Sequence, residues 1–162
     1  MPIKQSIIKK YTRREPSTDC LKYWRVIRKY IQTEYDVSEI DLEMLLYLYS
    51  EGLFNYYKFV EYSNVFGWDK TRFKRLTDKG MIHLFREKDR NEYRLYEVTR
   101  KCRHMITNMY KYMYMEKEIP ENPLRSKIFR KTGRYSDKVL AMSIKKFNEE
   151  VRKKVGYKVR SY

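Results

Sequence analysis

Two stretches of the chain repeat apolar residues every three or four positions, the period of a helix with one apolar side. In residues 19–35 the repeat is formed by Cys20, Trp24, Ile27, Ile31 and Tyr35. In residues 99–118, a helix that Thr99 can cap, it is formed by Cys102, Met105 or Ile106, Met109 and Met113, and three tyrosines widen it. We expect two helices with more apolar surface than one chain can bury. They predict the seam of a homodimer, formed by Trp24, Ile27, Ile31, Met105, Met109 and Met113.

Two further helices are predicted between these stretches. Residues 38–51 are apolar on almost every side, which indicates the most buried helix, with Ser38 and Asp41 at its start and Gly52 at its end. A shorter helix over residues 56–63 has Asn55 as its cap, and residues 64–67 form the turn that follows.

The next stretch predicts a short basic helix followed by a hairpin. Asp69 can cap a helix over residues 69–79, and Gly80 can end it. Phe73 and Leu76 face inward together, which leaves a largely basic outer surface. Residues 82–98 then alternate as two strands around a polar turn at 87–92.

The order of these elements, and the runs RLTDKGMI, KDR and EVTRKC, resemble the winged helix-turn-helix of MarR-type transcription regulators. The resemblance covers roughly residues 19–118. It implies a mainly α fold with a small β-hairpin wing, long flanking dimerisation helices and, in this chain, a basic C-terminal helix. Members of that family often sense small aromatic compounds, although no residue of this sequence identifies such an effector.

The resemblance also implies which residues contact DNA. The helix at 69–79 would enter the major groove, and the wing at 82–98 would follow the backbone or the minor groove. The residues implied in the helix are Lys70, Thr71, Arg72, Lys74 and Arg75. Those implied in the wing are Lys88, Arg90 and Arg94.

Charge divides the chain into three parts. The net charge is +16, and it is concentrated in a basic arm at residues 1–18 and an extension at 120–162, whereas the domain at 19–119 is nearly neutral. The extension predicts a helix near 136–155, with Val139, Leu140, Ile144, Phe147 and Val151 on one side. Such grouped positive charge favours a polyanionic partner.

The sequence offers little to catalysis, metals or membranes. Cys20, Cys102, His83 and His104 have no metal-ligand spacing, and no nucleophile with its base or phosphate-cradling glycine loop stands out. We therefore expect no enzymatic activity, no cofactor and no metal. No long apolar run suggests a membrane segment.

These observations lead to one expected function and one alternative. The expected function is a dimeric regulator that binds an inverted repeat in double-stranded DNA, located in the cytoplasm with the nucleoid. The alternative is an architectural or virion-associated nucleoprotein that uses the same fold for sequence-tolerant nucleic-acid binding or assembly. A regulator should prefer its site by several kcal/mol over random duplex (about 4–10 kcal/mol is typical), whereas a packaging protein should not.

Overall fold

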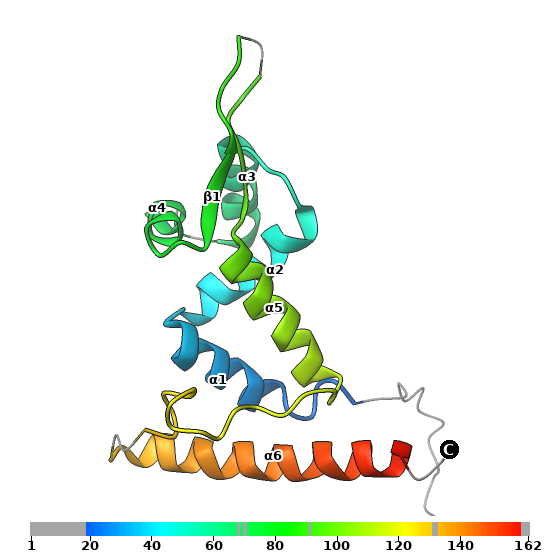
Figure 1. The fold of residues 1–162 in the computed structure, drawn as a ribbon. Helices are drawn as coiled ribbons and strands as arrows, with labels where there is room; N and C mark the ends of the chain where they lie inside the picture. The colour runs from blue at the N-terminus through cyan, green and yellow to red at the C-terminus, as the bar shows by residue number, and fades with distance from the viewer. Residues whose placement is uncertain (1–18, 68, 70, 91, 131–132, 160–162) are drawn as a thin grey trace, which may run out of the picture.

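Six helices and one two-stranded hairpin make up the described part of the chain (Figure 1). The computed structural model describes residues 19–67, 69, 71–90, 92–130 and 133–159, with no side-chain description for 157–159. The basic arm at 1–18 and Lys70 of the basic helix therefore lie outside the described residues. The elements are α1 (Trp24–Tyr35), α2 (Glu39–Glu51), α3 (Tyr56–Phe66), α4 (Thr71–Asp78), β1 (Ile82–Arg86), β2 (Leu95–Val98), α5 (Arg100–Met113) and α6 (Tyr135–Val159).

The molecule is tall, with the hairpin and α6 at opposite ends. Figure 1 shows α6 lying across the base, α1 above it, and α5 rising from the base towards the hairpin. The fold is mainly helical with one small antiparallel sheet, which is compatible with the winged helix expected from the sequence.

The helix ends follow the polar residues that the sequence offered. The Ser38 hydroxyl accepts the Asp41 N–H at 3.1 Å, and the Asp41 carboxylate accepts the Ser38 N–H at 3.2 Å, a complete capping box. Asn55 and Thr99 cap α3 and α5, as predicted, and each accepts one backbone N–H of the first turn. Gly67 ends α3 at a φ of 65°, the left-handed conformation that glycine adopts readily.

Several helices differ from the predicted ranges. α1 begins at Trp24 rather than near Asp19, because the Asp19 carboxylate accepts the N–H groups of Leu21 and Lys22 in a turn outside the helix. α3 continues to Phe66, so the turn before α4 is shorter than expected. α5 ends at Met113, near a left-handed Met115, and α6 is longer than predicted at both ends.

The hairpin is attached to the helices by a third segment. Ile82 pairs with Val98 and Leu84 with Tyr96, and the register shifts by one residue between Leu84 and Arg86. Tyr96 also exchanges backbone hydrogen bonds with Phe54, which lies between α2 and α3, at 2.7 and 3.0 Å. The base of the hairpin is therefore fixed to the helical body on its β2 side.

The apolar stripes of α1 and α5 are covered within one chain. Ile27, Ile31 and Met105 are completely buried, and Met109 is only 3% exposed. The premise that one chain cannot bury these side chains is therefore wrong, because α1 packs against both α5 and α6. Of the six residues predicted for a dimer seam, Trp24 and Met113 alone retain partial exposure. The homodimer itself stays a prediction.

The C-terminal helix packs against the domain, as the sequence predicts for three of its five apolar residues. Ile144, Phe147 and Val151 are buried, whereas Leu140 is partly buried and Val139 is 44% exposed. In addition, the amide of Asn148 accepts the Ile119 N–H at 2.9 Å and donates to the Ile119 carbonyl at 2.8 Å. One side chain thus satisfies both backbone groups of a residue in the irregular segment before α6.

The described helices include none with the length and apolar content needed to cross a bilayer. Nor do the described residues contain a group of three or more potential His, Cys, Asp or Glu ligands placed to hold a metal ion.

Candidate nucleic-acid interface

The inner side of α4 is held by aromatic packing. Leu76 is fully buried, and the ring of Phe73 lies edge-on to the rings of Phe59 and Tyr96, with centroids 4.9 Å apart in each case. A third ring, that of Tyr56, lies 5.3 Å away. These contacts come from α3 and from the hairpin, so both neighbours fix the orientation of α4. Its opposite side is consequently presented to solvent.

The exposed start of α4 is stabilised by Asp69. The Asp69 carboxylate accepts the Thr71 N–H at 2.9 Å and the Thr71 hydroxyl at 2.7 Å. Both hydrogen bonds lower the pKa of Asp69 below its usual value, and the one from the backbone N–H has the larger effect. Thr71, Lys74 and Arg75 are exposed along this helix. Three of the predicted base-contacting residues therefore lie where a ligand can reach them.

The position of Arg72 corrects the sequence prediction. Its guanidinium donates to Asp41 Oδ1 at 2.8 Å and to the Ser38 hydroxyl at 3.1 Å, and its side chain is only 16% exposed. Arg72 thus binds the start of α2 and is not displayed for base contact. The periodicity of α4 placed it outside the apolar stripe correctly, but α2 covers that side of the helix.

One carboxylate serves two arginines at this junction. Arg75 donates to the same Asp41 oxygen at 2.7 Å, although its side chain remains 45% exposed. Burial by itself would raise the pKa of Asp41, but hydrogen bonds from Ser38, Arg72 and Arg75 outweigh burial and lower the pKa to about 2. Asp41 therefore carries a negative charge at neutral pH and ties α4 to α2.

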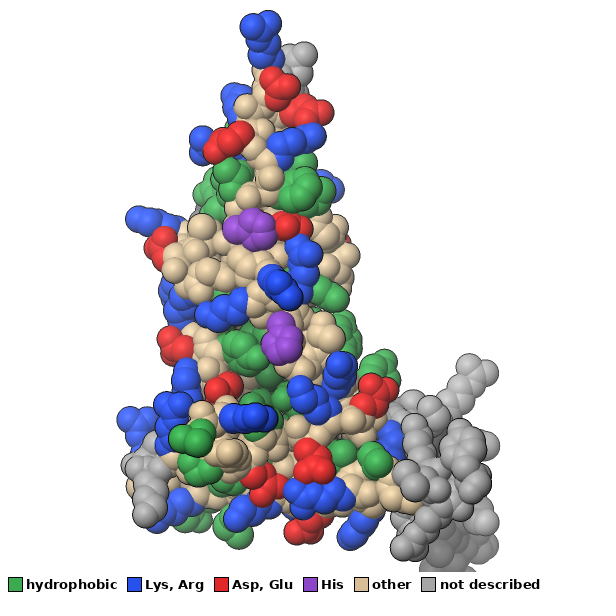
Figure 2. Space-filling model, in the orientation of Figure 1, with side chains coloured by type: hydrophobic (Ala, Val, Ile, Leu, Met, Phe, Trp, Pro, Cys, Tyr) green, Lys and Arg blue, Asp and Glu red, His purple; other side chains and the backbone are tan. Residues whose placement is uncertain are grey.

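The predicted wing residues differ in their availability. Lys88 and Arg90 are exposed at the tip, and their side chains have no acidic partner among the described residues. Arg94 instead donates to Glu87 at 3.0 Å across the hairpin, and Arg86 pairs with Glu92. Figure 2 shows this mixture of basic and acidic side chains along the hairpin, with a basic group at its end. Arg94 is thus paired within the hairpin, and its predicted contact with DNA stays a prediction.

The second role of Asp41 was not predicted from the sequence. The capping pattern Ser38-x-x-Asp41 was visible, but a cap occupies only part of a carboxylate's hydrogen-bonding capacity. A single acidic side chain facing into an otherwise apolar helix would have been the signal, because a buried charge needs a charged partner.

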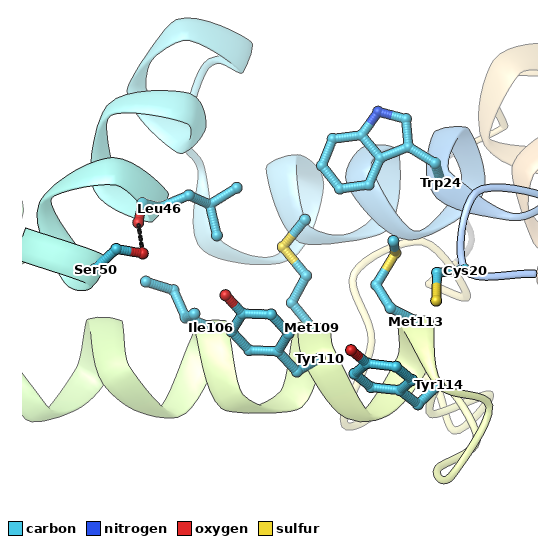
Figure 3. Close-up of a pocket in the computed structure, with 9 residues that line it drawn as sticks. All are labelled: Cys20, Trp24, Leu46, Ser50, Ile106, Met109, Tyr110, Met113 and Tyr114. Carbon is cyan, nitrogen blue, oxygen red and sulfur yellow. Dashed lines mark hydrogen bonds between the residues drawn. The ribbon is translucent and has the colours of Figure 1, made fainter. Parts of the chain in front are cut away.

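A small apolar pocket lies where α1, α2 and α5 meet. Its volume is about 230 Å³, and Figure 3 shows side chains from all three helices pointing into it, together with Cys20 just before α1. Trp24, Met109 and Met113, three of the predicted seam residues, line it. Its volume is below the range of about 300–1,000 Å³ that is typical of small-molecule sites. The geometry identifies no particular aromatic effector.

The arrangement as a whole presents a helix with an exposed polar and basic side, followed by a hairpin with a charged tip. Comparisons of the chain with models of protein families, with curated proteins and with solved structures found no match.

Proposed function

We propose that the chain is a winged helix-turn-helix protein that binds double-stranded DNA as a transcription regulator, with α4 as its recognition helix. One observation carries the proposal. α4 follows α3 after a glycine-capped turn, is fixed on its inner side by α3 and the hairpin, and exposes Thr71, Lys74 and Arg75 on the other. Short, well-anchored helices with polar outer sides are the elements that enter a major groove in such proteins.

The chemistry of the exposed residues suits base and phosphate contact. An arginine can bind O6 and N7 of guanine with two hydrogen bonds, and a threonine methyl can contact the methyl group of thymine. Arg75, Thr71 and Thr77 are the exposed residues of these types among the described residues of α4. Lys74 adds a positive charge, and Lys88 and Arg90 extend it to the wing tip, where phosphate contact contributes affinity without sequence choice.

We further propose a two-fold dimer, because one such helix reads only a half-site. The exposed edge of the α1, α2 and α5 pocket offers a surface for it, since Tyr110 and Tyr114 are 46% and 48% exposed there and Trp24 is partly exposed. Two α4 helices related in this way would contact half-sites about one helical turn of DNA apart.

Selection of bound sequences from random duplex DNA at physiological salt tests the proposal. We expect a palindromic consensus. Lys74→Ala/Arg75→Ala should weaken the selected site by about tenfold to a hundredfold, as expected for the loss of a base contact worth about 1–3 kcal/mol, and should relax one or more base positions.

The matched control removes two positive charges elsewhere. Lys145 and Lys153 are exposed on α6, and Lys145→Ala/Lys153→Ala should leave the consensus unchanged. Failure to enrich any sequence would favour the architectural alternative. If the α6 variant loses affinity while the α4 variant binds specific and random DNA like the wild type, the assignment of α4 is wrong.

A further inference from the structure

A second, polar cavity lies on the other side of α5. It is enclosed by the C-terminal part of α1, by α5 and by the irregular segment at 117–127, and its volume is about 570 Å³. Five cationic side chains line it: Lys79, Lys101, Lys117, Arg125 and Lys127. Only two carboxylates, those of Glu34 and Asp36, accompany them. The cavity thus has a clear excess of positive charge.

Most of this positive charge is not neutralised within the described part of the chain. Lys79 alone has a carboxylate partner there, at 3.2 Å from Asp36 Oδ2. Lys117 donates to the neutral amide oxygen of Asn108 at 2.8 Å. Glu34, the other carboxylate, accepts the backbone N–H of Lys127 at 2.9 Å rather than a side-chain ammonium group. Cations grouped in a hollow repel one another, and an anionic ligand would relieve that repulsion.

The wall behind these cations is rigid. Asn108 is 7% exposed, and its amide nitrogen lies 2.9 Å from Nε2 of His104 while its oxygen accepts Lys117. Tyr30 and Tyr112 are buried in an edge-to-face pair, with centroids 5.9 Å apart. The ammonium of Lys117 lies 6.0 Å from the centroid of the Tyr112 ring. The Asn108 amide and the ammonium of Lys117 are therefore oriented before a ligand arrives, which reduces the entropic cost of binding.

Phosphate is the anion that fits this chemistry best. Lysine and arginine are the usual ligands of phosphate, and several of them together suit adjacent phosphate groups. The volume falls within the range of about 300–1,000 Å³ that is typical of small-molecule sites. Figure 2 shows many Lys and Arg side chains, mixed with fewer acidic ones, over the lower part of the molecule below the hairpin.

We propose that this cavity binds a small molecule with two or more phosphate groups, and that the bound anion competes with Asp36 for Lys79. Lys79 directly follows α4, and its ammonium also donates to the Asp36 carbonyl at the end of α1. Loss of these contacts would free the C-terminal end of α4 from α1. This second part rests on the proposed function, since it makes the ligand a regulator of DNA binding.

Titration calorimetry with the full chain tests the site itself. The probes are inorganic pyrophosphate and adenosine triphosphate, with sodium sulfate at matched ionic strength as the reference. We expect either phosphate probe to bind at least tenfold more tightly than sulfate. Similar binding of both probes identifies adjacent phosphates as the recognised group. Tighter binding of adenosine triphosphate shows that the nucleoside is recognised as well. Lys101→Gln/Arg125→Gln should weaken binding at least tenfold, and Lys145→Gln/Lys153→Gln on α6 should not.

Thermal melting shows whether the Lys101→Gln/Arg125→Gln variant folds, and Arg125→Gln alone replaces it if it does not. Equal binding of phosphate probes and sulfate, or unchanged binding by the cavity variant, overturns the site. The site is also overturned if the wild type binds neither probe and the cavity variant binds duplex DNA more weakly than the wild type, because the cations then contact nucleic acid.

Duplex binding measured with and without the phosphate probe tests the regulation. We expect duplex affinity to change at least threefold when the probe is bound, and Asp36→Asn to reproduce that change without the probe. An unchanged affinity overturns the competition for Lys79. If the probe binds and duplex DNA does not, the proposed anion site is supported and the proposed function is refuted. If duplex binds and neither probe does, the inference fails and the proposed function stands.

Discussion

Asp41 joins helix capping and helix docking in a single carboxylate. It closes the capping box of α2 with Ser38 and receives the guanidinium groups of Arg72 and Arg75 from α4. Two positive charges share one negative charge, so this junction keeps a net positive charge beside the exposed side of α4. Arg75 is the more exposed of the two arginines, and a phosphate or guanine that binds it would compete with Asp41. We therefore expect DNA affinity and the stability of this junction to be linked.

Replacement of Asp41 by asparagine tests that junction. The variant removes the charge that compensates the buried Arg72, and we expect a lower melting temperature at neutral pH. Breaking a buried ion pair by removing one partner costs about 3–5 kcal/mol, and the remaining amide oxygen should keep the loss at the lower end of this range. The measurement is the free energy of unfolding in urea for both proteins.

The pH dependence of stability provides an independent measurement. The pKa of Asp41 in the folded protein is about 2, below its usual value of 3.8. The carboxylate therefore contributes stability above pH 4 and loses that contribution as the pH falls towards 2, by about 2 kcal/mol in all. Asp41→Asn should flatten the stability profile in this window. Parallel profiles for wild type and Asp41→Asn would contradict this account of the junction.

At the scale of the elements, local patterns were sufficient for the capped starts of three helices and for the inner sides of most helices. Ser38, Asn55 and Thr99 cap the helices that they were predicted to cap, because a cap is satisfied by residues two or three positions away. The role of Arg72 could not be predicted in this way. Its partner lies 31 residues earlier in the chain, and helical periodicity shows which residues share a side but not what packs against that side.

The docking of α6 leads to a prediction about stability. Phe147 is completely buried and its ring lies edge-on to that of Tyr23, with centroids 5.2 Å apart. Phe147→Ala should therefore lower the free energy of unfolding by about 3–5 kcal/mol, through lost burial and the cavity that remains. Met142, on the same helix, is 71% exposed, and Met142→Ala serves as the control with little expected effect. Urea denaturation measures both. A Phe147→Ala loss no larger than that of the control would show that α6 does not pack as described.

At the scale of the whole molecule, the sequence could not show which element packs against each apolar stripe. An apolar stripe is satisfied equally by another helix of the same chain and by a partner chain, so composition and spacing cannot distinguish them. The structure covers Ile27, Ile31 and Met105 with other parts of the same chain. A substitution at these positions would therefore unfold the monomer and would report nothing about a dimer.

The proposed dimer is better tested at the exposed edge of the pocket. Tyr110→Glu/Tyr114→Glu places two negative charges beside Trp24 without opening the core. We expect the wild type to sediment as a dimer and this variant as a monomer with a nearly unchanged melting temperature. Tyr135 is 82% exposed at the start of α6, and Tyr135→Glu is the control that should remain dimeric. A monomeric wild type at micromolar concentration would refute the dimer.

The short pairing of Phe54 with Tyr96 distinguishes the base of the hairpin, which is bound to the helices, from its exposed tip. The amide hydrogens of both residues are held by each other's carbonyl groups, and Phe54 belongs to the buried core. Their exchange with solvent deuterium therefore requires an opening of the helical body, whereas the exposed tip at 87–90 lies outside that cooperative unit. The hairpin accordingly has a fixed base, and the direction in which its tip projects is set by the core rather than by the turn that connects the strands.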